Sequence, residues 1–309
     1  MKIGLPVARF HPGNTGEYAQ RALSSLGHEA TILTVPEFLT ALPKQEFDYF
    51  LCVDSSEGIP LNDPSISGCS FKRVGFWFID YRHNKHRPTR VPTDFQNATS
   101  LQERGGWIFQ SQFEDVEDCR ATGISSVSWL PLAADAEVWT SEPAVPKEFH
   151  IGFVGNIWDL QRKRALDLLL RTNGLQVGFA QGKIWKEEAA ALMRRCMIGF
   201  NINTFFGEPY SYDINMRAFE TLSCGVPLFT NEIPSLYKVF PPEAPFIRTY
   251  SSIPDMLPSL LKAMKDPAFM NSGVEARHWI LENATYKHRM QTVLAQINSA
   301  GQRRRRERM

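Results

Sequence analysis

Residues 149–155 of the chain read Phe-His-Ile-Gly-Phe-Val-Gly, and Gln-Arg-Lys-Arg-Ala-Leu-Asp-Leu-Leu-Leu-Arg follows at 161–171. The first segment is a short apolar run, which predicts a buried strand, and the second has the apolar periodicity of a helix. A strand, a glycine turn and a helix open a doubly wound parallel α/β domain. We therefore predict that such a domain begins at residue 149.

The same order of elements occurs at the start of the chain. Residues 1–10 predict a strand, a His-Pro-Gly-Asn-Thr-Gly turn follows at 11–16, and residues 17–27 predict a helix that ends in glycine. Asn14 and Glu17 have the spacing of a capping box at the start of this helix. Two such openings in one chain predict an α/β fold with two Rossmann-like domains.

The boundary between the domains follows from composition. A stretch that contains Pro143 and Pro146 has few apolar residues, which is typical of a linker. An amphipathic pattern near the C-terminus predicts a last helix. Such a helix can cap the C-terminal domain, but we expect it to return toward the N-terminal domain. We divide the chain into an N-terminal domain, a linker, a C-terminal domain, a C-terminal helix and a basic tail, at residues 1–139, 140–148, 149–284, 285–300 and 301–309.

Composition excludes several classes of protein. With 43% hydrophobic and 22% charged residues, the chain has the balance of a globular protein rather than a disordered one. Its longest apolar run, Val74 to Ile79, is far shorter than the about 18 residues of a membrane-spanning helix. The N-terminus lacks the features of a signal peptide, and the scattered cysteines form no zinc-site pattern. We expect a cytoplasmic protein with reduced thiols and without a metal or cofactor.

Positive charge gathers at the C-terminus, where Arg303 to Arg306 and Arg308 outnumber one glutamate. Because the net charge is only +1, the rest of the chain is mildly acidic. Overall charge therefore does not require a nucleic-acid partner. The tail is either a solvated end or an arm for an anionic acceptor.

The segment with the most chemical information ends at Glu220. Asp213 is the predicted N-cap of a helix that ends before Gly225, and a helix N-terminus suits a diphosphate. Glu220 lies about two turns into this helix, near the face of Asn215 and Arg217. Its carboxylate can accept two hydrogen bonds from a ribose diol. The alternative is an ion pair between Glu220 and Arg217 on a solvated face.

Two candidate sites lie in the N-terminal domain. The turn at Gly13 and Asn14 brings backbone close to donor phosphates or to an acceptor, or it is only a turn. Asp80 and His83 follow an apolar strand, at the edge where α/β sheets bind ligands. Such a pair can orient or deprotonate an acceptor hydroxyl. The alternative is a buried aspartate that caps the next turn beside a surface histidine.

The stretch Asn-Met-Arg-Ala-Phe-Glu-Thr-Leu-Ser-Cys-Gly-Val-Pro-Leu at 215–228 resembles the nucleotide-sugar motif of GT-B glycosyltransferases, particularly the CgeB-like (spore maturation) group related to family 4. Further segments resemble motifs of that group in the same order along the chain. These segments are Trp77 to His83, Trp129 to Asp135, Phe153 to Arg164 and Thr285 to Arg289. Together they extend the resemblance over about residues 10–297.

The resemblance implies a GT-B architecture, with two Rossmann-like domains facing across a cleft. It implies a sugar transfer from a nucleoside-diphosphate donor in the C-terminal domain to an acceptor hydroxyl of a glycan, protein or DNA. Family 4 kinship further implies retention and no metal, which fits the absence of an Asp-x-Asp pair. Family 4 enzymes carry two glutamates eight positions apart, whereas Tyr212 stands eight positions before Glu220 here.

The resemblance also assigns donor contacts outside that helix. Without a metal, arginines and helix N-termini must stabilise the leaving diphosphate, which favours Arg162 and Arg164 beside the turn at Gly155 and Asn156. The alternative is a short solvated charge run. The Gln181–Gly182 turn occupies the position where GT-B proteins hold the base. A non-catalytic glycan- or nucleotide-binding module and a nucleotide-sugar epimerase remain alternatives to a transferase.

Overall fold

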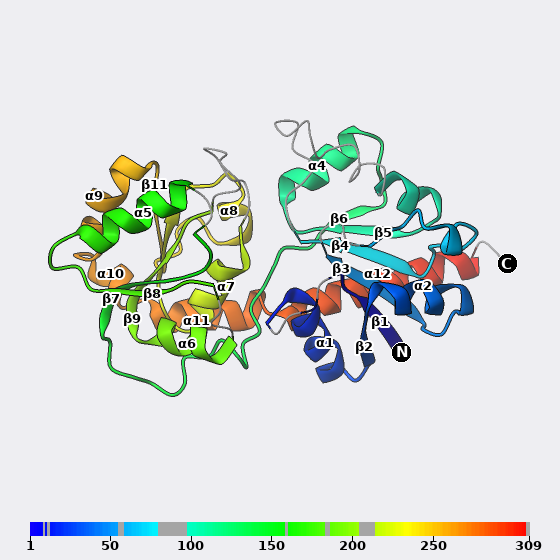
Figure 1. Cartoon of the computed structure of the whole chain (residues 1–309), viewed down its shortest axis with the longest axis horizontal. Coiled ribbons are helices and arrows are strands. Elements are labelled where there is room, and N and C mark those ends of the chain that lie inside the picture. Colours follow the sequence, from blue (N-terminus) through cyan, green and yellow to red (C-terminus); the bar gives the residue numbers. More distant parts are fainter. Residues whose placement is uncertain are drawn as a thin grey trace. The chain divides into compact units, whose positions relative to one another are not determined.

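A computed structural model of the chain describes two compact units (Figure 1). Unit 1 comprises Met1–Leu132 and Tyr286–Met309, and unit 2 comprises Ala133–Thr285. The described residues are 1–8, 10, 13–54, 59–79, 98–157, 160–182, 186–203 and 214–306.

Unit 1 is built on a six-stranded parallel sheet with the order β2-β1-β3-β4-β5-β6. Its strands are β1 Lys2–Pro6, β2 Glu29–Leu33, β3 Tyr49–Asp54, β4 Val74–Phe78, β5 Trp107–Gln110 and β6 Val127–Trp129. Its helices include α1 Thr15–Ser25, α2 Val35–Lys44, the short 3-10 helix Pro64–Ile66, α4 Phe113–Ala121 and α12 Tyr286–Arg306. Every residue of β4 is buried, as expected for a central parallel strand that is covered on both faces.

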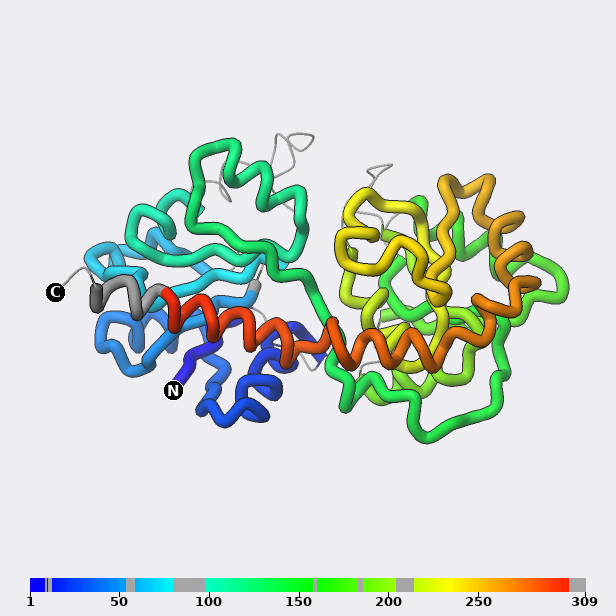
Figure 2. Tube along the Cα trace, turned by 180° about the vertical axis from the view of Figure 1, so that it is seen from behind, coloured from blue at the N-terminus to red at the C-terminus, as the bar shows by residue number. Residues whose placement is uncertain are grey.

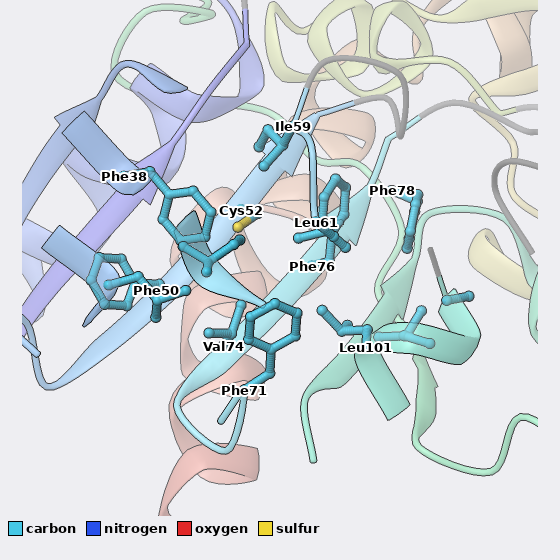
Figure 3. Packing of buried hydrophobic residues seen from close by; sticks show 14 of the residues in the cluster. Phe38, Phe50, Cys52, Ile59, Leu61, Phe71, Val74, Phe76, Phe78 and Leu101 are labelled. Carbon is cyan, nitrogen blue, oxygen red and sulfur yellow. The ribbon is translucent and has the colours of Figure 1, made fainter. Parts of the chain in front are cut away.

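Each face of this sheet has its own core. On one face, Phe38 of α2 and Phe50 of β3 pack edge to face with a centroid distance of 5.5 Å, and Phe76 and Leu101 continue the cluster (Figure 3). On the other face, Tyr286 of α12 contacts both Tyr18 and Trp77, at centroid distances of 5.2 and 6.1 Å. Figure 2 shows α12 beside α1 on this face.

The C-terminal helix therefore packs with the N-terminal domain, as the sequence predicts. It runs from Tyr286 to Arg306 and not from 285 to 300, so the first part of the predicted basic tail is helical. Arginine is a good helix former, and the tail contains no proline that would end the helix. None of the helices in the described part of the chain is long and apolar enough to cross a membrane.

Unit 2 has a five-stranded parallel sheet with the order β11-β10-β9-β7-β8. Its strands are β7 Phe149–Val154, β8 Val177–Ala180, β9 Cys196–Asn201, β10 Leu228–Asn231 and β11 Ile247–Tyr250. Its helices are α5 Leu160–Arg171, α6 Lys186–Arg194, α7 Met216–Ser223, α8 Leu236–Val239, α9 Ile253–Ala263, α10 Pro267–Met270 and α11 Gly273–Asn283. The predicted strand and helix at 149–155 and 161–171 correspond to β7 and α5. Residues 140–148, the predicted linker, contain no helix or strand.

The two faces of this second sheet differ in chemistry. Phe200, Phe229 and Tyr250 stack on the face that α5 and α9 cover. The opposite face carries Gly199, where a Cβ atom would collide with the Thr221 side chain of α7. The missing side chain lets α7 lie close to β9. Figure 1 shows α5 and α9 on one side of the sheet and α6, α7 and α11 on the other.

Candidate functional site

The strand order of unit 2 places a topological switch point between β7 and β9. The chain leaves β7 toward α5 on the aromatic face, and the next helix after β9 is α7 on the opposite face. Doubly wound sheets bind ligands in the crevice outside the carboxyl ends of two such strands. Gly155 and Asn156 follow β7 there, and Ile202 and Asn203 follow β9.

Arg162 connects the two sides of this switch point. Its Nη1 donates to the carbonyl of Asn156 at 2.8 Å, and its Nη2 donates to the carbonyl of Ile202 at 3.0 Å. The amide of Gly155 donates to the carbonyl of Ala180 in β8 at 3.1 Å. Arg162 therefore fixes the two loops between which a ligand would bind. The sequence pattern, a short run of charged residues, does not indicate this role.

Arg164, two residues further along α5, occupies a different environment. It is exposed and lines a cavity of about 440 Å³ that also involves Ile202, Asn231 and the first residues of α9. The two arginines that are near neighbours in the sequence thus have different surroundings, although both lie beside Ile202. Gln181 and Gly182 follow β8 on this edge, and Gly182 has a φ of +81°, in the left-handed region that glycine tolerates.

A network of amide side chains holds the N-terminus of α7 against the strand ends. The side-chain Nδ2 of Asn215 donates to Asn201 Oδ1 at 3.1 Å, and the backbone N–H of Asn215 donates to Asn203 Oδ1 at 3.3 Å. Asn203 in turn donates through its backbone N–H to Asn231 Oδ1 at 2.7 Å and through its side-chain Nδ2 to Thr230 Oγ1 at 3.2 Å. Asn201 and Asn203 are both buried. The network therefore fixes α7 relative to β9 and β10.

The N-cap of α7 is Asn215 and not Asp213. Asn215 Oδ1 accepts a hydrogen bond from the Arg217 amide at 3.1 Å, and α7 begins at Met216. Asp213 lies outside the described residues. Our sequence analysis also missed Asn201 and Asn203, although an Asn-x-Asn pair at the end of an apolar strand is a recognisable signal.

Glu220 is buried, with 1% of its side chain exposed. Arg217 Nη1 lies 2.6 Å from Glu220 Oε2, so the ion pair of the alternative interpretation exists. The solvated face that this interpretation assumed does not exist, because neighbouring segments cover the carboxylate. Burial raises the pKa of Glu220 to about 7, although Arg217 opposes the shift. The charges touch, yet neither carboxylate oxygen has a well-aligned hydrogen-bond donor among the described residues.

The N-terminal turn uses its polar groups to start α1. The Gly13 amide donates to Glu17 Oε2 at 2.7 Å, and the Glu17 amide donates to Asn14 Oδ1 at 2.9 Å. Glu17 thus reaches the amide before the N-cap instead of the N-cap amide that a capping box would use. The Glu17 carboxylate already accepts the hydrogen bond of the Gly13 backbone N–H, which is the donor that a bound phosphate would use. Asp80 and His83 lie outside the described residues.

Within the described part of the chain, no three His, Cys, Asp or Glu side chains are grouped so that they could hold a metal ion. All five cysteines are free.

Comparison with known proteins then decides the family. The glycosyl transferase-like family matches residues 141–295, which is just over half of the chain and includes β7, β9 and α7. The chain belongs to this family. No curated protein matches the sequence of this glycosyltransferase.

Solved structures share the fold of this glycosyltransferase at low sequence identity. Sucrose-phosphate synthase from Thermosynechococcus elongatus has a TM-score of 0.66 and 12% identity, over 97% of this chain and 100% of that one. An alpha-glucosyltransferase in complex with UDP-glucose and DNA containing an abasic site has a TM-score of 0.66 and 11% identity, over 96% and 99% of the chains. T4 phage BGT in complex with UDP and Mn²⁺ has a TM-score of 0.55 and 11% identity, over 96% and 99%. The predicted GT-B fold is confirmed.

Proposed function

We propose that this glycosyltransferase transfers a sugar from a nucleoside-diphosphate donor, first of all a UDP-sugar, to a hydroxyl group of an acceptor. The observation that carries the proposal is Glu220, a buried carboxylate on a helix fixed at the switch point, whose oxygens have no aligned donor in the part of the chain that the structure describes. Family membership supports the reaction class, and two of the solved structures above contain UDP or UDP-glucose.

The proposed roles follow from the chemistry of each group. The N-terminus of α7 suits the diphosphate, because the helix dipole favours negative charge there. Glu220 accepts hydrogen bonds from the ribose hydroxyls. Charge on the leaving diphosphate is stabilised by Arg164, with Arg162 holding the surrounding loops.

The remaining assignments extend the resemblance to the CgeB-like group and to family 4. They place Gly155 and Asn156 near the diphosphate and Gln181 and Gly182 near the base. Asp80 and His83 prepare the acceptor hydroxyl on a glycan, a protein or DNA, and the transfer proceeds with retention. Gly13 and Asn14 contribute through backbone shape, since their polar groups already start α1.

A prediction for Glu220 follows directly. Glu220→Gln replaces an ionised acceptor with a neutral one, so we expect it to weaken UDP binding at pH 8 by about 1–3 kcal/mol. Isothermal titration calorimetry measures the affinity. Glu188→Gln, an exposed substitution on α6, is the matched control and should bind as the wild type does. Equal affinity of the Glu220→Gln variant and the wild type would remove Glu220 from the donor site.

Incubation with UDP-, GDP- and dTDP-glucose in the absence of acceptor tests the reaction class. A transferase slowly releases nucleoside diphosphate by donor hydrolysis, an epimerase interconverts sugars, and a binding module does neither. We expect release to persist in EDTA, because arginines and helix N-termini replace the metal. The Mn²⁺ in the T4 phage BGT structure makes this control necessary. Release that stops in EDTA and returns with Mn²⁺ or Mg²⁺ would contradict the metal-free mechanism.

A further inference from the structure

Trp139, which belongs to no motif named above, lies against the helix that carries Glu220. Its side chain is buried, with 1% of the residue exposed. Its carbonyl accepts hydrogen bonds from Ser223 Oγ at the end of α7 and from Arg277 Nη1 of α11, the latter at 3.2 Å. The Ser223 carbonyl also accepts from Arg277 Nη1. These contacts fix the main chain of Trp139 relative to both helices.

The guanidinium group of Arg217 lies over the face of the Trp139 indole ring. The Cζ atom of Arg217 lies 4.8 Å from the ring centroid, and only 22% of its side chain is exposed. A planar cation over an aromatic face is attracted by the negative face of the ring, more strongly when water is excluded. Lysine retains the charge but lacks the planar guanidinium that stacks on the ring.

Arg217 is also the partner of Glu220, with 2.6 Å between Nη1 and Oε2. Burial opposes ionisation of Glu220, and the charge of Arg217 lowers its pKa against that effect. Burial raises the pKa of the nearby Cys224 thiol, on which Arg194 of α6, Arg277 of α11, Glu220 and Arg217 all act. Among the described residues, Arg217 is the cation that lowers the pKa of Glu220.

We propose that Trp139 and Arg217 are positioning residues of the donor site: the indole holds the guanidinium in place, and the guanidinium keeps the Glu220 carboxylate ionised and oriented for the ribose. This inference rests on the proposed function, since it assigns to Glu220 the ribose contact. It adds a buried tryptophan, outside the nucleotide-sugar motif itself, to the residues that decide donor affinity.

The test measures the dissociation constant of UDP between pH 5.5 and pH 9.5. Because the ionised carboxylate is the better acceptor, wild-type affinity should fall as the pH drops below about 7. Arg217→Gln removes the cation, so the midpoint should move to higher pH. If the midpoint moves from about pH 7 to pH 8, affinity at pH 7 should fall by up to about fivefold, and it should recover toward pH 9.5. Trp139→Leu should move the midpoint in the same direction by a smaller amount.

Three controls separate positioning from a general loss of structure. Glu220→Gln should give a flat pH profile, and Trp279→Leu, which removes a tryptophan of α11 that packs on Phe240, should keep the wild-type midpoint. The double variant Trp139→Leu, Arg217→Gln should behave as Arg217→Gln alone, because the indole acts through the guanidinium. Thermal unfolding confirms that each variant is folded.

The outcomes distinguish this inference from the proposed function. If Arg217→Gln lowers affinity equally at every pH with an unchanged midpoint, the positioning role is wrong. If the wild type and Glu220→Gln share the same flat profile, the ribose contact is wrong. In that case the pH at which the stability difference between the wild type and Glu220→Gln stops growing still reports the pKa of Glu220 in the folded protein without nucleotide. Arg217→Gln must raise this pH, or the positioning role fails on its own.

Discussion

Glu220→Gln is expected to remove about 3 kcal/mol of pH dependence from the free energy of unfolding between pH 4 and pH 8. Burial raises the pKa of Glu220 from 4.5 to about 7 in the folded protein, and Arg217 only partly offsets this. Because the folded pKa lies above the unfolded one, the group contributes most stability below pH 4.5. This contribution is lost as the pH rises through about 7. The glutamine side chain does not titrate. The free energy of unfolding of the variant should therefore rise relative to that of the wild type between pH 4.5 and about pH 7.

Urea unfolding at pH 4, 6 and 8 measures this difference. The quantity to compare is the free energy of unfolding of the variant minus that of the wild type, which should rise steadily with pH. Glu188→Gln controls for the loss of a negative charge, because that side chain is exposed on α6. Parallel stability curves for the wild type and Glu220→Gln would mean that the pKa of Glu220 in the folded protein stays at its ordinary value of 4.5. With the expected outcome, the Glu220→Gln variant combines higher stability at pH 8 with weaker nucleotide binding, which is a common trade-off at functional sites.

Arg289→Met is expected to lower the free energy of unfolding by about 2–4 kcal/mol, through loss of charged hydrogen bonds and exposure of their acceptors. Arg289 Nε donates to the Pro131 carbonyl at 2.8 Å, and Nη2 donates to the Leu132 carbonyl at 3.2 Å. Burial lowers the pKa of Arg289 to about 10, so the group remains a cation at neutral pH. Methionine fills part of the space but leaves both carbonyls without their donor.

Lys287→Met on the same helix is the control, because Lys287 is exposed. Urea unfolding at pH 7.5 compares the two variants with the wild type, and only Arg289→Met should shift the midpoint strongly. A shift of the same size in both variants would show that the effect comes from the helix surface and not from the two carbonyls. Tyr286, which packs on Tyr18 and Trp77, begins the same segment. Three of the segments that resemble the CgeB-like group therefore meet through structural contacts.

The sequence alone was sufficient for the elements that depend on local pattern. The apolar run at 149–155 and the periodic segment at 161–171 predicted β7 and α5, and the glycine turn between them predicted a parallel α/β domain. Strand and helix periods are local properties of a few consecutive residues, so they can be recognised without knowledge of the rest of the chain. The motif around Glu220 was likewise recognisable, because its residues are contiguous.

Only the tertiary structure decided what surrounds those residues. The spacing of Arg217 and Glu220 predicted an ion pair but placed it on a solvated face, because spacing along one helix says nothing about the segments that cover it. Trp139, far away in sequence, lies against the Arg217 guanidinium of that pair. Arg162 and Arg164 are nearly adjacent in sequence, yet one bridges two loops and the other lines a cavity. Burial and charge state depend on contacts between distant segments, and a local sequence pattern does not contain them.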